Sequence, residues 1–221
     1  MRNSTQHKLY WLLMLSIYPC VDIIAQESVT KYHINVRADF SVPHIESNKA
    51  LKNSFRGTYD VTPSINIPLF YGVFIGGSYK YSTASDKLGL PTSSKAQYAI
   101  SGGAIKLGYD HYINPTTLFT TAINYGMSSV HFKNLPSDTV PPSYKSSYIE
   151  PSLGFQFFIE DNFAIGVNLS YVMLNQYTFN PYRISFDPYK SFEANDLKGT
   201  TQYLNLGFGV VYAFWKKKSS K

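Results

Sequence analysis

Apolar and polar residues alternate over the last regular stretch of the chain, residues 200–215. Large apolar side chains hold every second position: Leu204, Leu206, Phe208, Val210, Tyr212 and Phe214. The positions between them are mostly small or polar: Tyr203, Asn205, Gly207, Gly209, Val211 and Ala213. A period of two predicts a β-strand with one face in an apolar medium. The stretch is long enough to cross a bilayer as a tilted strand, which takes about 9–11 residues, and it ends on aromatic residues suited to a membrane interface.

The same alternation predicts seven earlier strands. Their ranges are 32–40, 58–69, 73–82, 97–112, 118–131, 148–159 and 163–174. Short turns follow the second, fourth and sixth strands, whereas long polar segments follow the first, third, fifth and seventh. This regular change between short and long connections is typical of an up-and-down barrel with short periplasmic turns and long outer loops.

Two of the predicted strands are irregular. In the second strand, Pro63 and Pro68 each remove a hydrogen-bond donor from the ladder, which weakens the prediction. In the fourth strand, the apolar parity changes between Ile100 and Ile105, on either side of Gly102-Gly103. A β-bulge at this glycine pair would supply one extra residue and keep the apolar residues on one face.

The polar faces of the strands indicate which side of the barrel meets lipid. A barrel in water, such as a lipocalin, would have Lys and Glu outside and an apolar cavity inside. Here the polar faces carry mainly small residues, such as Gly154, Gly166, Asn168 and Ser170, which suit a narrow interior. We therefore predict an all-β fold, an eight-stranded antiparallel up-and-down transmembrane β-barrel, over the soluble alternative.

Composition and the first residues support an envelope protein. Charged residues make up 15% of the chain, against about 25% in soluble domains, and aromatic residues make up 16%. The apolar run 9–21 after Lys8, with small Ala25 near its end, predicts a signal peptide at residues 1–25 and a barrel domain at 26–221. A lipoprotein acylated at Cys20 is the alternative, although Ile-Tyr-Pro before the cysteine fits it poorly. The chain has a net charge of +6, but its basic residues form no stripe with interleaved aromatic residues. We therefore expect no nucleic-acid partner.

The chain resembles the small outer-membrane β-barrel family, the OmpA/OmpX-like eight-stranded barrels. The segments YIEPSLGFQFFI (148–159), NFAIGVNLSYVML (162–174) and LNLGFGVVYAFW (204–215) carry the resemblance, with the signal peptide. The resemblance implies a bacterial outer-membrane location and insertion by the barrel-assembly machinery, which reads a terminal aromatic residue. Here Phe214-Trp215 is followed by KKKSSK, which departs from the family pattern.

Charged residues on the polar faces form a candidate site inside the barrel. They are Arg37, Asp39, Asp60, Lys80, Lys106, Asp110 and Glu150. Three positive and four negative charges in a narrow space should form pairs, because an unpaired buried charge costs several kcal/mol. This pattern favours a structural polar plug, and the alternative is the gate of a narrow pore.

The pattern of candidate catalytic residues is weak. The histidines after the signal peptide are His33, His44, His111 and His131, and the chain has no His-x-Ser motif. The residues show no metal-ligand spacing, and we predict no cofactor and no enzymatic activity. A lipid-modifying enzyme remains the least favoured alternative.

Aromatic residues in the predicted outer loops offer a possible binding surface. They include Tyr144, Tyr177, Tyr182 and Tyr189, and Pro141-Pro142 lies beside the first of them. Packing within the loops, or an upper aromatic girdle, is the alternative interpretation. We therefore expect a monomer in outer-membrane lipid that contributes envelope structure or binds an extracellular ligand through its outer loops.

Overall fold

The computed structural model describes residues 34–47, 49–87, 97–133, 143–175 and 200–214. The predicted signal peptide, Cys20 and most of the long loops lie outside the described residues. The described elements are β1 (Asn35–Ile45), α2 (Lys49–Ser54), β2 (Phe55–Phe70), β3 (Val73–Asp86), β4 (Gln97–Asn114), β5 (Thr117–Lys133), β6 (Ser143–Glu160), β7 (Phe163–Leu174) and β8 (Thr201–Ala213). Within these ranges, no helix is long and apolar enough to span a membrane.

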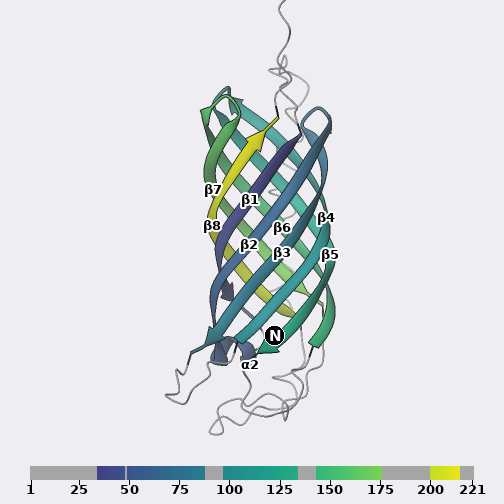
Figure 1. Cartoon of the computed structure of the whole chain (residues 1–221), viewed down its shortest axis with the longest axis vertical. Helices are drawn as coiled ribbons and strands as arrows, with labels where there is room; N and C mark the ends of the chain where they lie inside the picture. The colour runs from purple at the N-terminus through teal and green to yellow at the C-terminus, as the bar shows by residue number, and fades with distance from the viewer. Residues whose placement is uncertain (1–33, 48, 88–96, 134–142, 176–199, 215–221) are drawn as a thin grey trace, which may run out of the picture. The chain divides into compact units, whose positions relative to one another are not determined.

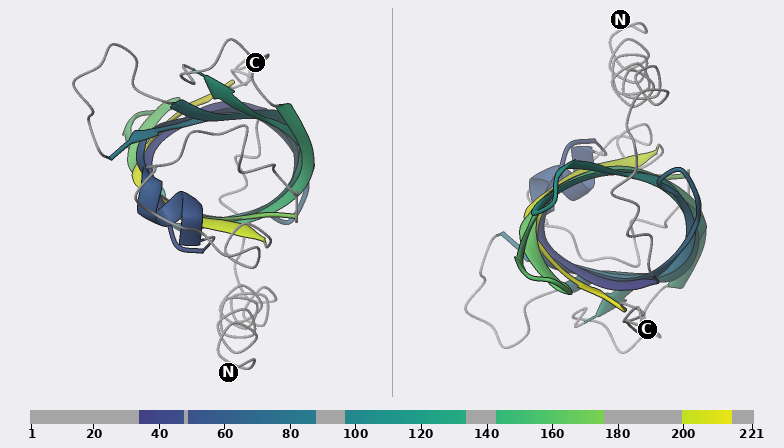
Figure 2. Two further views of the ribbon diagram at one scale, coloured as in Figure 1. Left: turned by 90° about the horizontal axis from the view of Figure 1, so that it is seen from below. Right: turned by 90° about the horizontal axis from the view of Figure 1, so that it is seen from above.

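The eight strands form one closed antiparallel barrel in sequence order (Figures 1 and 2). β1 closes the barrel against β8, in a register that runs from Asn35↔Ala213 to Ile45↔Tyr203. Closure leaves no strand edge unpaired, which is a requirement for any sheet inside a bilayer. The predicted fold of eight antiparallel strands in up-and-down order is confirmed.

The strand registers give the barrel its tilt. Following paired residues once around the wall, from Asn35 through each strand in turn, leads back to β1 at Ile45, ten residues further along. With a rise of about 3.3 Å per residue and strands about 4.8 Å apart, this stagger corresponds to a tilt of about 40°. Because the offset is even, the inward face of each strand stays inward around the whole circumference.

The outer face of the barrel is apolar and exposed. Its members include Ile65, Ile75, Ile105, Leu107, Tyr125, Val167, Leu206 and Phe208. The inner face holds buried polar side chains at the alternate positions, among them Ser64, Ser78, Asn124 and Asn205. A barrel with its apolar side chains outside and its polar side chains inside is the arrangement expected in lipid.

Short turns join the strands at one end of the barrel. At the β2–β3 turn, Tyr71 has φ 46° and Gly72 has φ 85°. Positive φ at both central residues defines a two-residue type I′ hairpin, whose twist matches that of the strands it joins. At the β4–β5 turn, the backbone N–H of Thr116 donates to Oδ1 of Asn114 at 2.9 Å. The long connections lie at the opposite end, where α2 follows β1 (Figure 1).

The structure corrects the sequence predictions at two places. Strands β1, β2, β3 and β6 extend further at the end with the long connections than predicted, and α2 occupies part of the first predicted loop. The predicted bulge at Gly102-Gly103 is wrong, since β4 keeps an unbroken register with both neighbours there. Tyr98 and Ile100 instead point into the barrel and are buried, whereas Ile105 faces outward.

Candidate functional site

A buried lysine lies at the centre of the barrel lumen. Lys80, halfway along β3, has a side-chain exposure of 1%. Its Nζ donates to Asp60 Oδ1 at 3.2 Å and Oδ2 at 3.0 Å. It also lies 2.9 Å from Oε1 of Glu150 on β6. Three strands therefore meet through one ammonium and two carboxylates, and we call Lys80, Asp60 and Glu150 the central triad.

Neutral side chains complete the hydrogen bonding of the triad. Thr62 Oγ1 donates to Asp60 Oδ1 at 3.0 Å. Ser170 Oγ donates to Glu150 Oε1 at 2.7 Å, and Asn124 Nδ2 donates to Glu150 Oε2 at 3.4 Å. Buried ions are tolerated when their remaining lone pairs are satisfied in this way, and one that loses its partner is costly.

A second group of charges lies towards the short-turn end of the lumen. Arg37 Nε donates to Asp39 Oδ1 at 2.9 Å, and Asn168 Nδ2 donates to the same oxygen at 2.8 Å. With its amide oxygen facing the guanidinium, Gln156 accepts from both terminal nitrogens of Arg37 at 2.6 Å. Gly154 leaves the space for this guanidinium, because a Cβ there would lie 2.4 Å from Arg37 Nη2.

The two remaining predicted charges have neutral partners. Lys106 Nζ donates to Ser64 Oγ at 3.3 Å and lies 5.9 Å from the centroid of the Phe74 ring, a cation–π distance. Asp110 Oδ1 accepts from Thr120 Oγ1 at 2.7 Å. The structure thus brings five of the seven predicted charges into ion pairs, and places Lys106 and Asp110 nearby on the same inner face.

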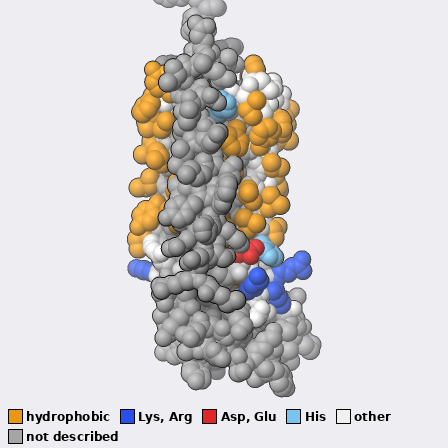
Figure 3. Space-filling view, turned by 180° about the vertical axis from the view of Figure 1, so that it is seen from behind, with side chains coloured by type: hydrophobic (Ala, Val, Ile, Leu, Met, Phe, Trp, Pro, Cys, Tyr) orange, Lys and Arg blue, Asp and Glu red, His pale blue; other side chains and the backbone are white. Residues whose placement is uncertain are grey.

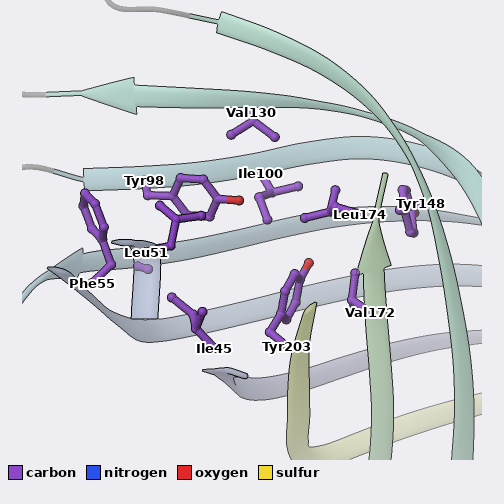
Figure 4. Packing of buried hydrophobic residues seen from close by; sticks show 11 residues of the cluster. Ile45, Leu51, Phe55, Tyr98, Ile100, Val130, Tyr148, Val172, Leu174 and Tyr203 are labelled. Atoms are coloured by element: carbon purple, nitrogen blue, oxygen red, sulfur yellow. The ribbon is translucent and has the colours of Figure 1, made fainter. Parts of the chain in front are cut away.

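Apolar side chains fill the lumen at the end with the long connections (Figure 4). The cluster consists of Ile45, Leu51, Phe55, Ala84, Tyr98, Ile100, Val130, Tyr148, Val172, Leu174 and Tyr203. Figure 4 shows these side chains projecting into the barrel from strands around the wall. Leu51 comes from α2 and is fully buried, so the helix supplies a side chain that the strands do not. We call this cluster the apolar cap.

A smaller apolar group lies inside the opposite end of the barrel. Its buried members are Phe74, Leu118, Ala122, Ala164, Val211 and Ala213. Phe74 fills the space beside Gly108, where an added Cβ would lie 2.3 Å from the Phe74 ring. The lumen therefore has three layers: the apolar cap, a charged middle, and this second apolar group.

Sequence reasoning identified the charged residues but missed the cap. The cap residues Tyr98, Ile100 and Val130 share the inward parity of their strands, which the lipid-facing interpretation of apolar residues overlooked. The neutral partners of the triad, such as Ser170 and Asn205, were recognised only as small lumen residues. Ser170 and Asn205 occupy inward positions of their strands, as Glu150 and Asp60 do. This shared inward position is the sequence signal that could have grouped them.

Within the described residues, Ser128 and His131 do not share one face of β5. Ser128 points into the barrel, where its Oγ donates to the carbonyl of Ser146 at 3.1 Å. His131 lies three residues further along β5 and so belongs to the opposite face. No group of three or more potential metal ligands occurs within the part of the chain that the structure describes. His33, Tyr177, Tyr182 and Tyr189 lie outside the described residues.

Comparison with known proteins supports the fold. No family model and no curated protein sequence matches the chain. Neisserial surface protein A has a similar structure, with 12% identity, a TM-score of 0.55, and coverage of 82% of this chain and 97% of that protein. The attachment invasion locus protein of Yersinia pestis is 12% identical, with a TM-score of 0.47 and coverage of 84% and 100%. The outer membrane protease OmpT from Escherichia coli is 9% identical, with a TM-score of 0.41 and coverage of 86% and 99%. The chain has the fold of the small eight-stranded outer-membrane barrels.

Proposed function

We propose that this protein is an integral bacterial outer-membrane barrel with a closed lumen, which acts through its outer surface and outer loops and does not conduct solutes. The observation that carries the proposal is the layered lumen, in which an ion-paired centre lies between two apolar groups. In this proposal the chain is a non-enzymatic monomer in outer-membrane lipid, inserted by the barrel-assembly machinery. It contributes envelope structure or binds a ligand outside the cell.

The outer face supports the membrane location. Residues such as Ile105, Leu206 and Val167 are more than half exposed on the barrel wall. In water this surface would form an apolar patch far larger than monomeric soluble proteins expose. In a bilayer the same surface replaces lipid–lipid contacts, and the closed barrel leaves no strand edge unpaired.

The lumen supports the closed state. A permeating ion would have to separate Lys80 from Asp60 or Glu150, and breaking such a buried pair costs about 3–5 kcal/mol. It would also have to pass the apolar cap, where the side chains are mostly hydrocarbon and the tyrosine hydroxyls of Tyr98, Tyr148 and Tyr203 offer little to replace its water. The alternative function, a narrow gated channel, would require both the central triad and the apolar cap to move.

Single-channel recording on the refolded mature chain tests this proposal. A gel first establishes that the unheated protein migrates as a heat-modifiable β-form in lipid vesicles. We then expect no steady conductance in a planar bilayer, for the wild type or for Lys80→Gln, because the apolar cap closes the lumen independently of the triad.

Two outcomes contradict the proposal in different ways. A chain that stays outside vesicles and folds in water would overturn the membrane location and restore the soluble barrel. A folded barrel whose steady conductance rises in Lys80→Gln or Glu150→Gln would identify a gated pore.

A further inference from the structure

We propose that the lumen binds one monovalent alkali cation beside the central triad, held by Glu150 Oε2, Asn205 Oδ1 and the Tyr203 hydroxyl oxygen. The position lies between the triad and the apolar cap, inside the barrel wall. We call these three residues the cation site. The inference goes beyond the proposed function, because it concerns what completes the charge of the lumen and not what the outer surface contacts.

The charges of the lumen balance towards the short turns but not at the central triad. Two cations, Arg37 and Lys106, accompany two carboxylates, Asp39 and Asp110, towards the short turns. The triad has one ammonium and two carboxylates, so its formal charge is −1 (1 − 2). On the face that Figure 3 shows, hydrophobic side chains cover most of the described wall and charged ones gather near one end. In such apolar surroundings an uncompensated charge is unfavourable, so the triad favours a counter-charge.

The contacts of the two carboxylates favour their ionised forms. The described side chains that hydrogen-bond to Asp60 and Glu150 all act as donors: Lys80, Thr62, Asn205, Ser170 and Asn124. Donors stabilise the charged form of a carboxyl group, whereas a protonated carboxyl needs an acceptor for its own O–H. A cation therefore supplies the counter-charge better than a proton does.

Oxygen atoms with unused acceptor capacity lie beside the triad. Every carboxylate oxygen of the triad has a donor, but within the described residues Glu150 Oε2 has only Asn124 Nδ2, at 3.4 Å. Asn205 Oδ1 and the Tyr203 hydroxyl are buried and have no hydrogen-bond partner in the part of the chain that the structure describes. Because a buried polar atom without a partner is costly, such an atom indicates a ligand or water at its free side.

Ser170 brings these oxygen atoms together. Its hydroxyl donates to Glu150 Oε1 at 2.7 Å and accepts from Asn205 Nδ2 at 3.3 Å. Asn205 Nδ2 also donates to Asp60 Oδ2 at 3.4 Å, which directs the amide oxygen away from that carboxylate. Tyr203 lies two residues before Asn205 on the inward face of β8, and Figure 4 shows its hydroxyl pointing into the lumen. Its oxygen is within electrostatic range of Glu150, so the three oxygens surround one region beside the triad.

An alkali cation fits both the charge and the donor atoms. Carboxylate, amide and hydroxyl oxygens are ligands for hard cations, and carbonyl oxygens can replace the hydration shell of an alkali ion. One monovalent cation makes the triad neutral, whereas a divalent cation would leave it with a charge of +1. A water molecule would satisfy the two unpartnered oxygens but would leave the negative charge in place.

The dependence of unfolding on alkali ions tests the cation site. The refolded full-length mature barrel is unfolded by urea in neutral-lipid vesicles. Sodium chloride or potassium chloride replaces choline chloride, so that the ionic strength stays constant. A cation that binds only the folded barrel stabilises it by mass action. For at least one of the two ions, we expect the unfolding equilibrium constant to fall about tenfold for each tenfold rise in concentration above the dissociation constant.

Two tyrosine variants locate the effect. Tyr203→Phe removes only the hydroxyl of the cation site, and Tyr98→Phe makes the same change elsewhere in the apolar cap. We expect Tyr203→Phe to bind the alkali ion at least about tenfold more weakly, whereas Tyr98→Phe should keep the ion dependence of the wild type. In choline alone, Tyr203→Phe should be at least as stable as the wild type, because it removes a buried hydroxyl without a partner.

A charge variant tests the reason for binding. Glu150→Gln removes the excess negative charge, so its unfolding should be the same in choline, sodium and potassium. If Glu150→Gln shows no heat-modifiable form, the comparison of Tyr203→Phe with Tyr98→Phe decides alone.

Several outcomes would overturn the cation site. Wild-type unfolding that is equal in sodium, potassium and choline would show that no alkali ion binds. Stability that rises as the pH falls and ignores both ions would identify a proton as the counter-charge. An equal loss of ion dependence in Tyr98→Phe and Tyr203→Phe would place the bound ion away from the triad.

These outcomes are distinguishable from failure of the proposed function. A barrel without conductance and without ion-dependent stability keeps the proposed function and loses the cation site. A barrel that conducts ions and whose stability depends on the Tyr203 hydroxyl loses the closed lumen and keeps the cation site.

Discussion

At the scale of single residues, Lys80 shows how a charge is tolerated inside the barrel. Its ammonium has three protons, and four oxygen atoms of Asp60, Thr62 and Glu150 surround it. The carboxylates in turn accept from neutral neighbours, so the desolvation cost of the ions is offset by a complete set of hydrogen bonds. Removing one carboxylate should therefore affect the whole group.

We expect Glu150→Gln to lower the free energy of unfolding by about 2–3 kcal/mol, because Lys80 keeps only Asp60 as a charged partner and Ser170 loses a charged acceptor. Urea unfolding in lipid vesicles, followed by gel mobility, measures the change. Glu160→Gln is the matched control, since Glu160 is exposed at the β6–β7 turn and should leave stability unchanged. Equal stability of both variants would remove Glu150 from the network.

At the scale of elements, the β2–β3 hairpin depends on one glycine. Gly72 has φ 85°, and a Cβ there would lie 2.4 Å from the carbonyl oxygen of Asp110. Gly77 lies five residues later on β3, and a Cβ there would meet nothing within 4 Å. The two positions compare a constrained glycine with an unconstrained one in the same strand pair.

Gly72→Ala should destabilise the barrel by roughly 2 kcal/mol, since alanine disfavours the left-handed region and its Cβ meets the neighbouring backbone. Gly77→Ala should change stability by less than about 1 kcal/mol. Parallel urea titrations of the two variants measure the difference. A loss in Gly77→Ala as large as that in Gly72→Ala would contradict this interpretation of the turn.

Helix α2 packs against the barrel through Leu51, which is buried in the apolar cap, and Lys87 adds hydrogen bonds to the carbonyls of Lys52 and Ser54. Leu51→Ala should therefore release the helix, and trypsin should cleave after Lys52 at least tenfold faster in membrane-inserted protein. Asn53→Ala provides the control because Asn53 is an exposed residue of the same helix. Unchanged cleavage in Leu51→Ala would show that the cap does not retain α2.

The alternation of apolar and polar residues predicted the eight strands and their order, because every outward position that faces lipid must carry an apolar side chain. The rule failed where the inner face became apolar, as at Tyr98 and Ile100, since parity alone does not say which medium a residue meets. It also stopped short of Ser41–Ile45 and Phe55, because the outward residues His44 and Arg56 are polar and interrupt the alternation. The contact of Lys80 with Glu150, between the non-adjacent strands β3 and β6, depends on the ten-residue stagger, which no local pattern records.

At the scale of the whole molecule, the outer and inner sides of the barrel wall differ in the distribution of apolar and charged side chains. The outer side is apolar along most of its length, whereas the inner side is apolar only at its ends and charged between them. A barrel in water would tolerate new charge on its outer side, and a barrel in lipid would not. A substitution on the outer wall therefore distinguishes the two environments without reference to ligand or conductance.

Val167→Arg tests this distinction, because Val167 is 58% exposed on β7 and faces outward from the wall. In a bilayer we expect a loss of about 2–4 kcal/mol if Val167 lies near the midplane, whereas Ser143→Arg, at the outer end of β6, should cost about 0–1 kcal/mol. Reversible urea unfolding in vesicles measures both variants against the wild type. If Val167→Arg and Ser143→Arg are equally stable, the outer wall does not face hydrocarbon. A large difference between them would place the wall in the membrane, because in water both arginines would be equally well hydrated.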